Sequence, residues 1–238
     1  MRSGKLLVTI HQPDHLPWLG LMNKIDQSDL FVVLDCVQLS KKVFQNRNRV
    51  IGPSDCTDPT WLTVPIATAN HQRFALSAIE INNQIDWQRR YKNVLYDRYH
   101  NHPFWHEHRQ YLDSLFSRKF DKLVDFNMDI IRYFLEALGI STPIVFASSL
   151  QPTGSKSELN LSICHQTKAN IYLAGPLSRL YLDEGLFLRN GIDVRYHEFL
   201  HPTYKQYGRT SFSSHLSTLD LLMNHGQNSI EYIRRGTS

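Results

Sequence analysis

Residues 8–20 read VTIHQPDHLPWLG, and residues 30–35 read LFVVLD. The first stretch begins as a short apolar strand, turns polar at His11 and leads into a helix. The second is a continuous apolar run that ends at Asp35, the pattern of a parallel strand covered on both faces. A strand, a polar turn, a helix and a second strand in one short span are typical of α/β proteins, which bind ligands at such turns. We therefore expect His11 and Asp35 to lie at the same edge of a sheet.

The rest of the chain continues this alternation of strands and helices. Apolar runs predict further strands, and apolar residues at helical spacing predict four more helices before the last strand. The predicted strands are 61–65, 144–147, 171–174 and 192–196, and the predicted helices are 86–99, 103–117, 121–138 and 158–167. We expect an α/β fold with a Rossmann-like, mostly parallel sheet, as one domain over residues 1–238 with a helical insert at about 86–138.

Composition narrows the choice of partner. The 26 Lys and Arg residues against 22 Asp and Glu give a net charge of +4, spread along the chain without a dense basic block. This argues against nucleic acid as a partner and weakly favours small anionic ligands. Oligomerisation is left open.

The cysteine content and the hydropathy of the chain indicate the cellular compartment in which the protein works. The three cysteines, Cys36, Cys56 and Cys164, are an odd number without metal-type spacing, which suits reduced thiols in a cytosolic protein. No stretch approaches the roughly 20 apolar residues that a membrane span needs, and the N-terminal apolar run is too short for a signal peptide. We expect a cytoplasmic protein without a membrane span.

His11 and Asp35 are the candidate catalytic pair. An imidazole titrates near neutral pH, so His11 can serve as a general base, with Asp35 orienting it or holding a substrate ammonium. The competing interpretation is that His11, at a strand end beside prolines, is a hydrogen-bonded structural group.

The polar segment from residue 38 to residue 49 offers amide and guanidinium groups. It forms either a solvated edge strand or hairpin, or a wall that contacts a phosphate or a sugar. The candidate wall residues are Gln38, Asn46, Arg47 and Asn48.

Gly154, Ser155, Lys156 and Ser157 form the candidate phosphate site. A glycine turn at a helix N-terminus presents backbone amides, two hydroxyls and a lysine to an anion, although the spacing is not that of a Walker A loop. Alternatively the turn only caps the helix, with Ser155 as the cap and Glu158 as its capping-box partner. We predict no metal site and no required cofactor, because Pro103 interrupts the histidine cluster at 100–108.

Several motifs resemble the WbqC-like family from about residue 6 to about residue 226. The motifs are His11-Gln12-Pro13 with Leu16 to Gly20, Asp35 with Val37-Gln38, Gln45 to Asn48, Trp61 to Pro65, Ser148-Ser149, Gly175, Tyr181-Leu182 and Pro202-x-Tyr204-x-Gln206. The resemblance implies a protein of bacterial O-antigen or other surface-polysaccharide gene clusters, with a suggested glycine-transferase role. It also implies that the site is lined by Gln12, His15, Gly175, Tyr181, Tyr204 and Gln206. His15 and Cys36 depart from the family pattern, which more often has an aromatic residue and a second acid there.

The order of strand, polar turn, helix and strand also looks like the first half of the nucleotidylyltransferase superfamily. In that superfamily a His-x-x-His turn holds the phosphates of a nucleotide, whereas here the second histidine falls on Trp18. The resemblance therefore implies the fold more than adenylate chemistry.

These features lead to three functional hypotheses. The first is a transferase acting on a nucleotide-linked sugar, which acylates a sugar amine with glycine or another small acyl group. The others are a non-catalytic module that binds a nucleotide sugar or a partner, and an adenylate-forming enzyme. In the first, His11 and Asp35 act on the amine while Arg47 and residues 154–157 hold the diphosphate.

Overall fold

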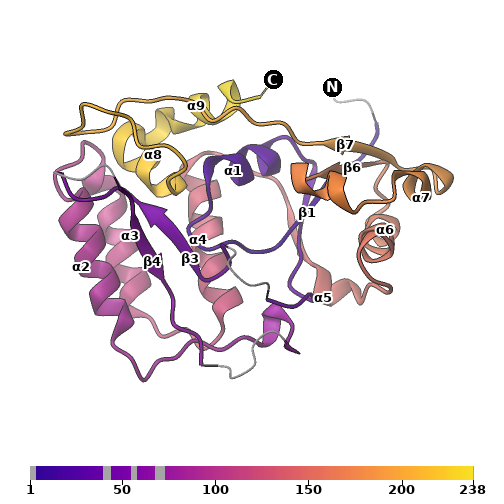
Figure 1. Cartoon of the computed structure of the whole chain (residues 1–238), viewed down its shortest axis with the longest axis horizontal. Coiled ribbons are helices and arrows are strands. Elements are labelled where there is room, and N and C mark those ends of the chain that lie inside the picture. Colours follow the sequence, from indigo (N-terminus) through magenta and orange to yellow (C-terminus); the bar gives the residue numbers. More distant parts are fainter. Residues whose placement is uncertain (1–3, 40–43, 55–57, 68–72, 238) are drawn as a thin grey trace.

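The computed structural model describes residues 4–39, 44–54, 58–67 and 73–237. Within them, five parallel strands form a sheet in the order β5-β2-β1-β6-β7 (Figure 1). The strands are β1 Leu7–His11, β2 Leu30–Val33, β5 Ile144–Phe146, β6 Ile171–Ala174 and β7 Asp193–Tyr196. Counted along the chain, this is the order 3-2-1-4-5 that begins a Rossmann sheet. The predicted Rossmann-like α/β fold is confirmed.

Helices cover both faces of the sheet because its strands are apolar on both sides. Phe31 and Val33 of β2 face one buried cluster, and Val32 faces the other. The first face packs against α1 Leu19–Asp26, α4 Leu123–Ala137, α8 Thr218–His225 and α9 Ser229–Arg235. The second packs against α6 Ser157–Gln166 and α7 Glu184–Arg189. This two-sided burial explains the continuous apolar runs in the sequence.

Three long helices lie between β2 and β5 in the chain. They are α2 Trp87–Tyr99, α3 Trp105–Ser117 and the α4 helix named above, and α2 and α3 lie at the left of the molecule in Figure 1. All three fall within one or two residues of the helices that the apolar spacing predicted. This layer contributes 15 of the 39 buried residues of the larger cluster.

A two-stranded hairpin accompanies the first turn of the chain. Strands β3 Arg47–Val50 and β4 Thr60–Thr63 pair antiparallel, and backbone bonds tie the segment to the first loop, with the His15 amide donating to Phe44 O at 2.7 Å. Shorter helical turns are α5 Ala147–Leu150, η2 Leu76–Ala78, η3 Pro176–Leu180 and η4 Gly226–Asn228. The hairpin and the turn after β1 therefore form one structural unit.

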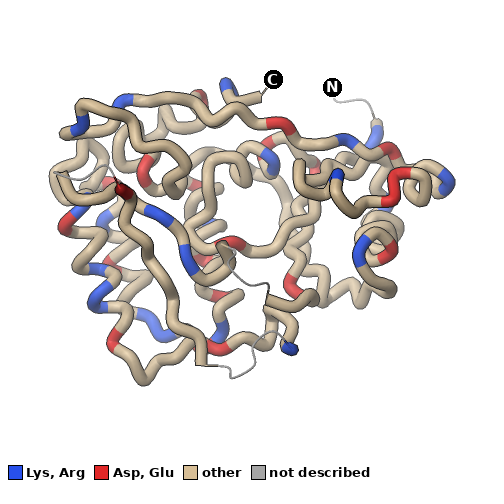
Figure 2. Tube along the Cα trace, viewed as in Figure 1, with Lys and Arg blue, Asp and Glu red and all other residues tan. Residues whose placement is uncertain are grey.

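Surface charge and thiols follow the sequence pattern. Lys and Arg alternate with Asp and Glu over the surface, as Figure 2 shows. Cys36 and Cys164 are free thiols, and Cys56 lies outside the described residues. In the described part of the chain, none of the helices combines the length and apolarity needed to cross a bilayer.

Candidate functional site

The carboxyl ends of β1 and β6 meet at the point where the strand order reverses. From β1 the chain crosses to β2 on one side, while β6 pairs with β1 on the other. In open α/β sheets such a switch point is the usual ligand crevice. Three residues lie at the carboxyl ends of these strands in this chain: His11 ends β1, Gly175 follows β6 and His197 follows β7. Sheet topology thus brings together three positions that are up to 186 residues apart in the chain.

His11 bonds a protein group through one ring nitrogen, and the other forms no hydrogen bond with the part of the chain that the structure describes. Its Nδ1 donates to Gln12 O at 2.9 Å, because a carbonyl oxygen can only accept. The Oδ2 atom of Asp14 lies 4.0 Å from the same Nδ1. The neutral ring therefore carries its proton on Nδ1, and the unprotonated Nε2 belongs to a side chain that is 30% exposed.

Lys24 brings a buried cation into this cluster. It lies on the buried face of α1, is 3% exposed, and its Nζ donates to Ile10 O at 3.2 Å. A Cβ atom at Gly175 would lie 3.9 Å from Nζ, so the glycine borders the ammonium directly. Burial lowers the pKa of Lys24 to about 7, and burial raises the pKa of Asp14 to about 7, while the two charges stabilise each other. Lys24 and Asp14 are thus two buried groups of opposite charge, each of which can gain or lose a proton near neutral pH.

His197 occupies the other side of Lys24. Its Nε2 donates to Asn23 Oδ1 at 2.7 Å, since Asn23 uses its Nδ2 to donate to Ile233 O. Burial and then the charge of Lys24 lower the pKa of His197 to about 4. The same two causes, in the same order, hold the pKa of His11 well below 6.5. Both imidazoles are therefore neutral at pH 7.

A surface groove of about 390 Å³ opens beside His197. It offers an aromatic ring, a guanidinium group and apolar side chains to a ligand. Its lining residues are Trp18, Pro176, Arg179, His197, Glu198, Phe199 and Leu200. Pro176 and His197 place the groove at the carboxyl ends of β6 and β7.

Two residues predicted in the first turn have firm structural partners. Gln12 accepts through Oε1 from Gln45 Nε2, which also donates to Asp14 Oδ1 at 3.4 Å. His15 is fully buried, donates from Nδ1 to Asn127 Oδ1 at 3.0 Å and accepts at Nε2 from the Tyr91 hydroxyl. Gln12 therefore borders the cluster, whereas His15 faces the helical layer.

Asp35 lies at the same sheet edge but is engaged elsewhere. Its Oδ1 accepts from the Ser148 amide at 2.9 Å, and its Oδ2 accepts from the Ser148 hydroxyl at 2.6 Å. The carboxylate thereby holds the first turn of α5. The structure places Asp14, at 4.0 Å, as the carboxylate beside the His11 Nδ1 atom.

The predicted amide and guanidinium wall is the β3–β4 hairpin. Asn48 is buried and donates to the carbonyls of His15 and Leu16, and Asn46 donates to Val64 O. Gln38 is exposed and forms an isolated bridge with Ala75. The two asparagines fix the loop and the hairpin by bonds to backbone carbonyls.

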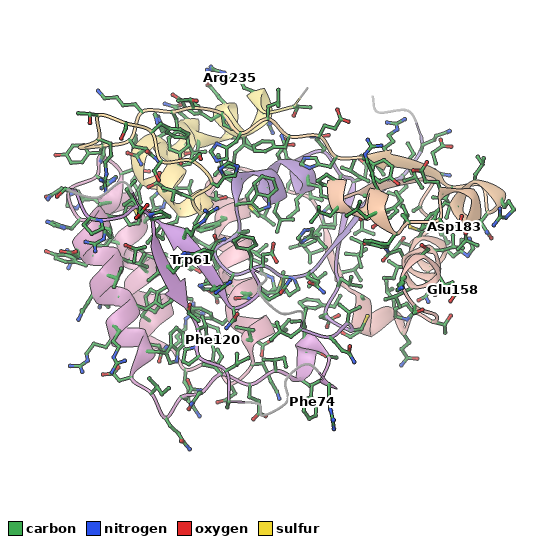
Figure 3. All side chains as sticks on the ribbon, in the orientation of Figure 1. Trp61, Phe74, Phe120, Glu158, Asp183 and Arg235 are labelled. Atoms are coloured by element: carbon green, nitrogen blue, oxygen red, sulfur yellow. The ribbon has the colours of Figure 1, made fainter. Side chains whose placement is uncertain are left out.

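Arg47 and Trp61 form the exposed part of this wall. The Arg47 guanidinium lies 4.8 Å from the centre of the Trp61 ring, and Arg49 lies 5.5 Å from it. Figure 3 labels Trp61 on β4, beside β3, where Figure 2 shows basic positions. The hairpin therefore carries two cations on one aromatic ring.

Residues 154–157 lie on the opposite side of the molecule from Trp61. Figure 3 labels Glu158 and Asp183 on neighbouring segments at the right, and the Asp183 amide donates to Ser157 Oγ at 3.0 Å. The predicted capping by Ser155 is wrong: Lys156 is the residue before α6, and no side-chain cap bond forms there. Gly154, Ser155 and Lys156 are exposed. The Tyr181 hydroxyl forms a hydrogen bond with Ser178 Oγ, in which either oxygen can be the donor. The structure does not bring this turn together with Arg47.

Tyr204 and Gln206 converge on a carboxylate that the sequence analysis did not select. The Tyr204 hydroxyl and Gln206 Nε2 each donate to Asp220 Oδ2 at 2.9 Å, and the Tyr99 hydroxyl donates to Oδ1 at 3.1 Å. Asp220 is fully buried. This network joins α2, α8 and the loop between β7 and α8.

Three residues of the cluster were missed by the sequence analysis: Asp14, Lys24 and His197. Each left a signal. His197 follows a predicted strand as His11 does, and Lys24 lies three residues after Leu21, on the face of α1 that the apolar spacing marks as buried. A lysine on a buried helix face needs a nearby acceptor or carboxylate, which here is Ile10 O and Asp14.

Comparison with known proteins gives the family. The model of the WbqC-like protein family matches residues 12–232. The chain belongs to the WbqC-like protein family. This WbqC-like protein is also 27% identical over 232 residues to "Uncharacterized protein Rv1507c" of Mycobacterium tuberculosis (strain ATCC 25618 / H37Rv), covering 95% of this chain and 97% of that protein. No solved structure matches the WbqC-like chain.

Proposed function

We propose that this WbqC-like protein is a cytoplasmic transferase that acylates the amine of a nucleotide-linked amino sugar in surface-polysaccharide biosynthesis, with glycine as the acyl group. The resemblance to proteins of O-antigen gene clusters supports the pathway. One observation carries the chemistry: a neutral His11, with its proton on Nδ1 and an unprotonated Nε2, stands at the switch point of the sheet. A base in this position matches the proton transfer that acylation of an amine requires.

The cluster divides the chemical step among its side chains. The sugar amine attacks the carbonyl carbon of an activated glycyl donor, and the proton of the attacking nitrogen moves to His11 Nε2 as the leaving group departs. The imidazolium that forms has its Nδ1 4.0 Å from the Asp14 carboxylate, which stabilises the positive charge. Asp35 supports the edge through Ser148 instead of contacting the reacting atoms.

The groove beside His197 provides the position for the nucleotide part of the substrate. Trp18 offers a ring for stacking, and Arg179 offers a guanidinium group that suits a diphosphate. Arg179 lies 3.4 Å from Glu198 and both are more than half exposed, so this weak ion pair opens readily for an anion. Gly175 adds no side chain beside the Lys24 ammonium.

A transfer assay tests the proposal. Purified protein is incubated with UDP- and dTDP-linked amino sugars and a glycyl thioester, and mass spectrometry detects a glycyl group on the sugar amine. We expect product with the wild type, loss of at least about 100-fold in rate for His11→Gln, since general-base catalysis contributes that much or more, and an unchanged rate for His106→Gln. His106 is an exposed histidine on α3 and serves as the matched control.

The other two hypotheses correspond to different results. Binding of the nucleotide sugar in a calorimetric titration, with no product from any activated glycyl donor, would identify a non-catalytic binding module. Release of pyrophosphate from ATP in the presence of glycine would identify an adenylate-forming enzyme. Either result would replace the transferase assignment.

A further inference from the structure

Strand β7 forms one edge of the five-stranded sheet. It pairs with β6 on one side, through Ile171↔Asp193 to Ala174↔Tyr196, and among the described residues no strand pairs with it on the other side. Edge strands carry unpaired backbone donors and acceptors that can pair with another chain. The open side of β7 is thus a surface with a defined hydrogen-bonding pattern.

The parallel ladder fixes which residues of β7 face outward. The Asp193 amide donates to Asn170 O at 2.9 Å, and the His197 amide donates to Ala174 O at 2.9 Å. Backbone groups of a strand alternate in direction, so Asp193, Arg195 and His197 turn theirs toward β6. Val194 and Tyr196 consequently turn their N–H and C=O groups toward the open side.

We propose that two copies of this chain pair through β7, antiparallel, about a two-fold axis at Val194, to form a continuous ten-stranded sheet. At the axis, Val194 faces the partner's Val194, and the two residues exchange both backbone hydrogen bonds, as outward-facing groups require. On either side of the axis, Asp193 then lies opposite the partner's Arg195. A closed two-fold pairing removes both exposed edges at once.

Charge complementarity favours this register. Side chains of Asp193 and Arg195 share one face of the strand, because residues two apart in a strand do. In the proposed register each pair of opposite residues joins a carboxylate and a guanidinium, whereas a shift by two residues would lose both pairs. Opposite pairs that do not exchange hydrogen bonds have the closest side chains in an antiparallel ladder, so the charges meet where the strands approach most. Figure 2 shows acidic and basic positions close together along this edge.

Exposed leucines flank β7 at both ends. Leu188 of α7 precedes the strand and is 72% exposed, and Leu200 follows it and is 71% exposed. Antiparallel pairing brings the end with Leu188 of one copy beside the end with Leu200 of the other. Pairing would cover part of this exposed apolar surface, and burial of apolar surface favours association. The leucines add an apolar contribution that the short strand alone would lack.

Charge reversal tests the pairing on the full-length chain. Light scattering after size-exclusion chromatography measures the molar mass, and we expect twice the 27.8 kDa of one chain for the wild type. Arg195→Asp opposes two carboxylates and Asp193→Arg opposes two guanidinium groups, so each variant alone is expected at the mass of one chain. Mixing the two variants restores opposite charges at both positions and is expected to restore the dimer. Arg90→Asp, an exposed charge reversal on α2, is the control and should leave the dimer unchanged.

The proposal would be overturned if the wild type had the mass of one chain at every soluble concentration. It would also be overturned if Arg195→Asp and Asp193→Arg both remained dimers. Circular dichroism confirms that each variant is folded. If a variant fails to fold, hydrogen exchange on the wild type decides instead: the amides of Val194 and Tyr196 should exchange more slowly as protein concentration rises. Unchanged exchange of both amides would refute the pairing. These outcomes do not depend on the transferase assignment.

Discussion

Substitution of Asp220 by asparagine is expected to destabilise the protein far from the sheet edge. Asp220 is fully buried and accepts hydrogen bonds from Tyr99, Tyr204 and Gln206. The Gln206 amide cannot turn around, because its Oε1 accepts from the Ser213 amide at 2.8 Å while its Nε2 donates to Ser213 O. In Asp220→Asn, an NH₂ group at the Oδ2 position would therefore face the Gln206 NH₂ group, and an NH₂ group at the Oδ1 position would leave the Tyr99 hydroxyl without its acceptor.

The cost follows from the bonds that are lost. A hydrogen bond to a charged acceptor contributes about 1.5–3 kcal/mol, and a buried unpaired donor costs about 1–3 kcal/mol. Asparagine retains only one of the two acceptor oxygens, so we expect a loss of about 3 kcal/mol in the free energy of unfolding at pH 7.5. Tyr204→Phe removes one donor and keeps the ring, and should cost about 1–2 kcal/mol.

The pH dependence gives a sharper test. Burial raises the pKa of Asp220 to about 6, although its three hydrogen-bond donors oppose the shift. Because the native state binds this proton more tightly than the unfolded chain, the contribution is fully present below about pH 4 and is lost as the pH rises through 6. The asparagine variant has no titrating group at this position and therefore lacks this pH-dependent contribution to stability. Its deficit relative to wild type should therefore be about 2 kcal/mol larger at pH 4.5 than at pH 7.5.

Urea unfolding of both proteins at these two pH values measures the effect, with unchanged m-values as the sign that the unfolded states are comparable. Every other titrating group is shared, so it cancels in the difference between the two proteins. An equal deficit at both pH values, or a larger one at pH 7.5, would refute the raised pKa. A deficit below about 1 kcal/mol at both would refute the role of the network itself.

Three further predictions concern other parts of the molecule. Burial lowers the pKa of His15 to about 4, so the stability that its neutral ring contributes is lost as the pH falls from 6.5 to 4. Urea unfolding at pH 7 and pH 4.5 should show that His15→Gln loses about 2 kcal/mol less unfolding free energy between these pH values than the wild type does. Gly226→Ala should lower stability by about 2–3 kcal/mol, because the glycine has a φ of +50° and a Cβ there would lie 2.3 Å from the Phe104 ring. Lys24→Met should raise the pKa of His11 toward 6.5 in an NMR titration, since the Lys24 charge is the second cause of its depression after burial.

The helices and strands could be predicted from the sequence because each depends on the spacing of apolar residues within its own segment. The buried strands and the three helices between 86 and 138 show apolar residues at spacings that few other structures explain. Strand alternation with helices then implies the parallel sheet, and the carboxyl-end rule places His11 and Asp35 on one edge. What the pattern could not supply was the direction of each side chain. The Asp35 carboxylate accepts a hydrogen bond from Ser148, and the Asp14 carboxylate lies beside His11.

The remaining site residues escaped prediction because their roles arise from packing between distant segments. Tyr204 and Gln206 were placed at the site by resemblance alone, and both serve Asp220, a residue inside an apolar helix that the pattern hid. Lys24 and His197 are 173 residues apart, and only the pairing of β6 with β1 and β7 brings them together. A residue's partner across a sheet depends on strand order, which no local spacing records.

The charge of Lys24 sets the condition under which His11 becomes a stronger base. In the free protein, burial and the Lys24 charge both favour the neutral imidazole, which keeps His11 a weak proton acceptor. An anionic group of a substrate in the groove would oppose that charge, since an anion within several ångströms raises the pKa of an imidazole. It would also favour the protonated Lys24, whose pKa of about 7 leaves it poised between states. For the nucleotide-linked amino sugar that we propose as the substrate, binding of its phosphates is therefore expected to raise the pKa of His11 and to make it a better proton acceptor for the amine.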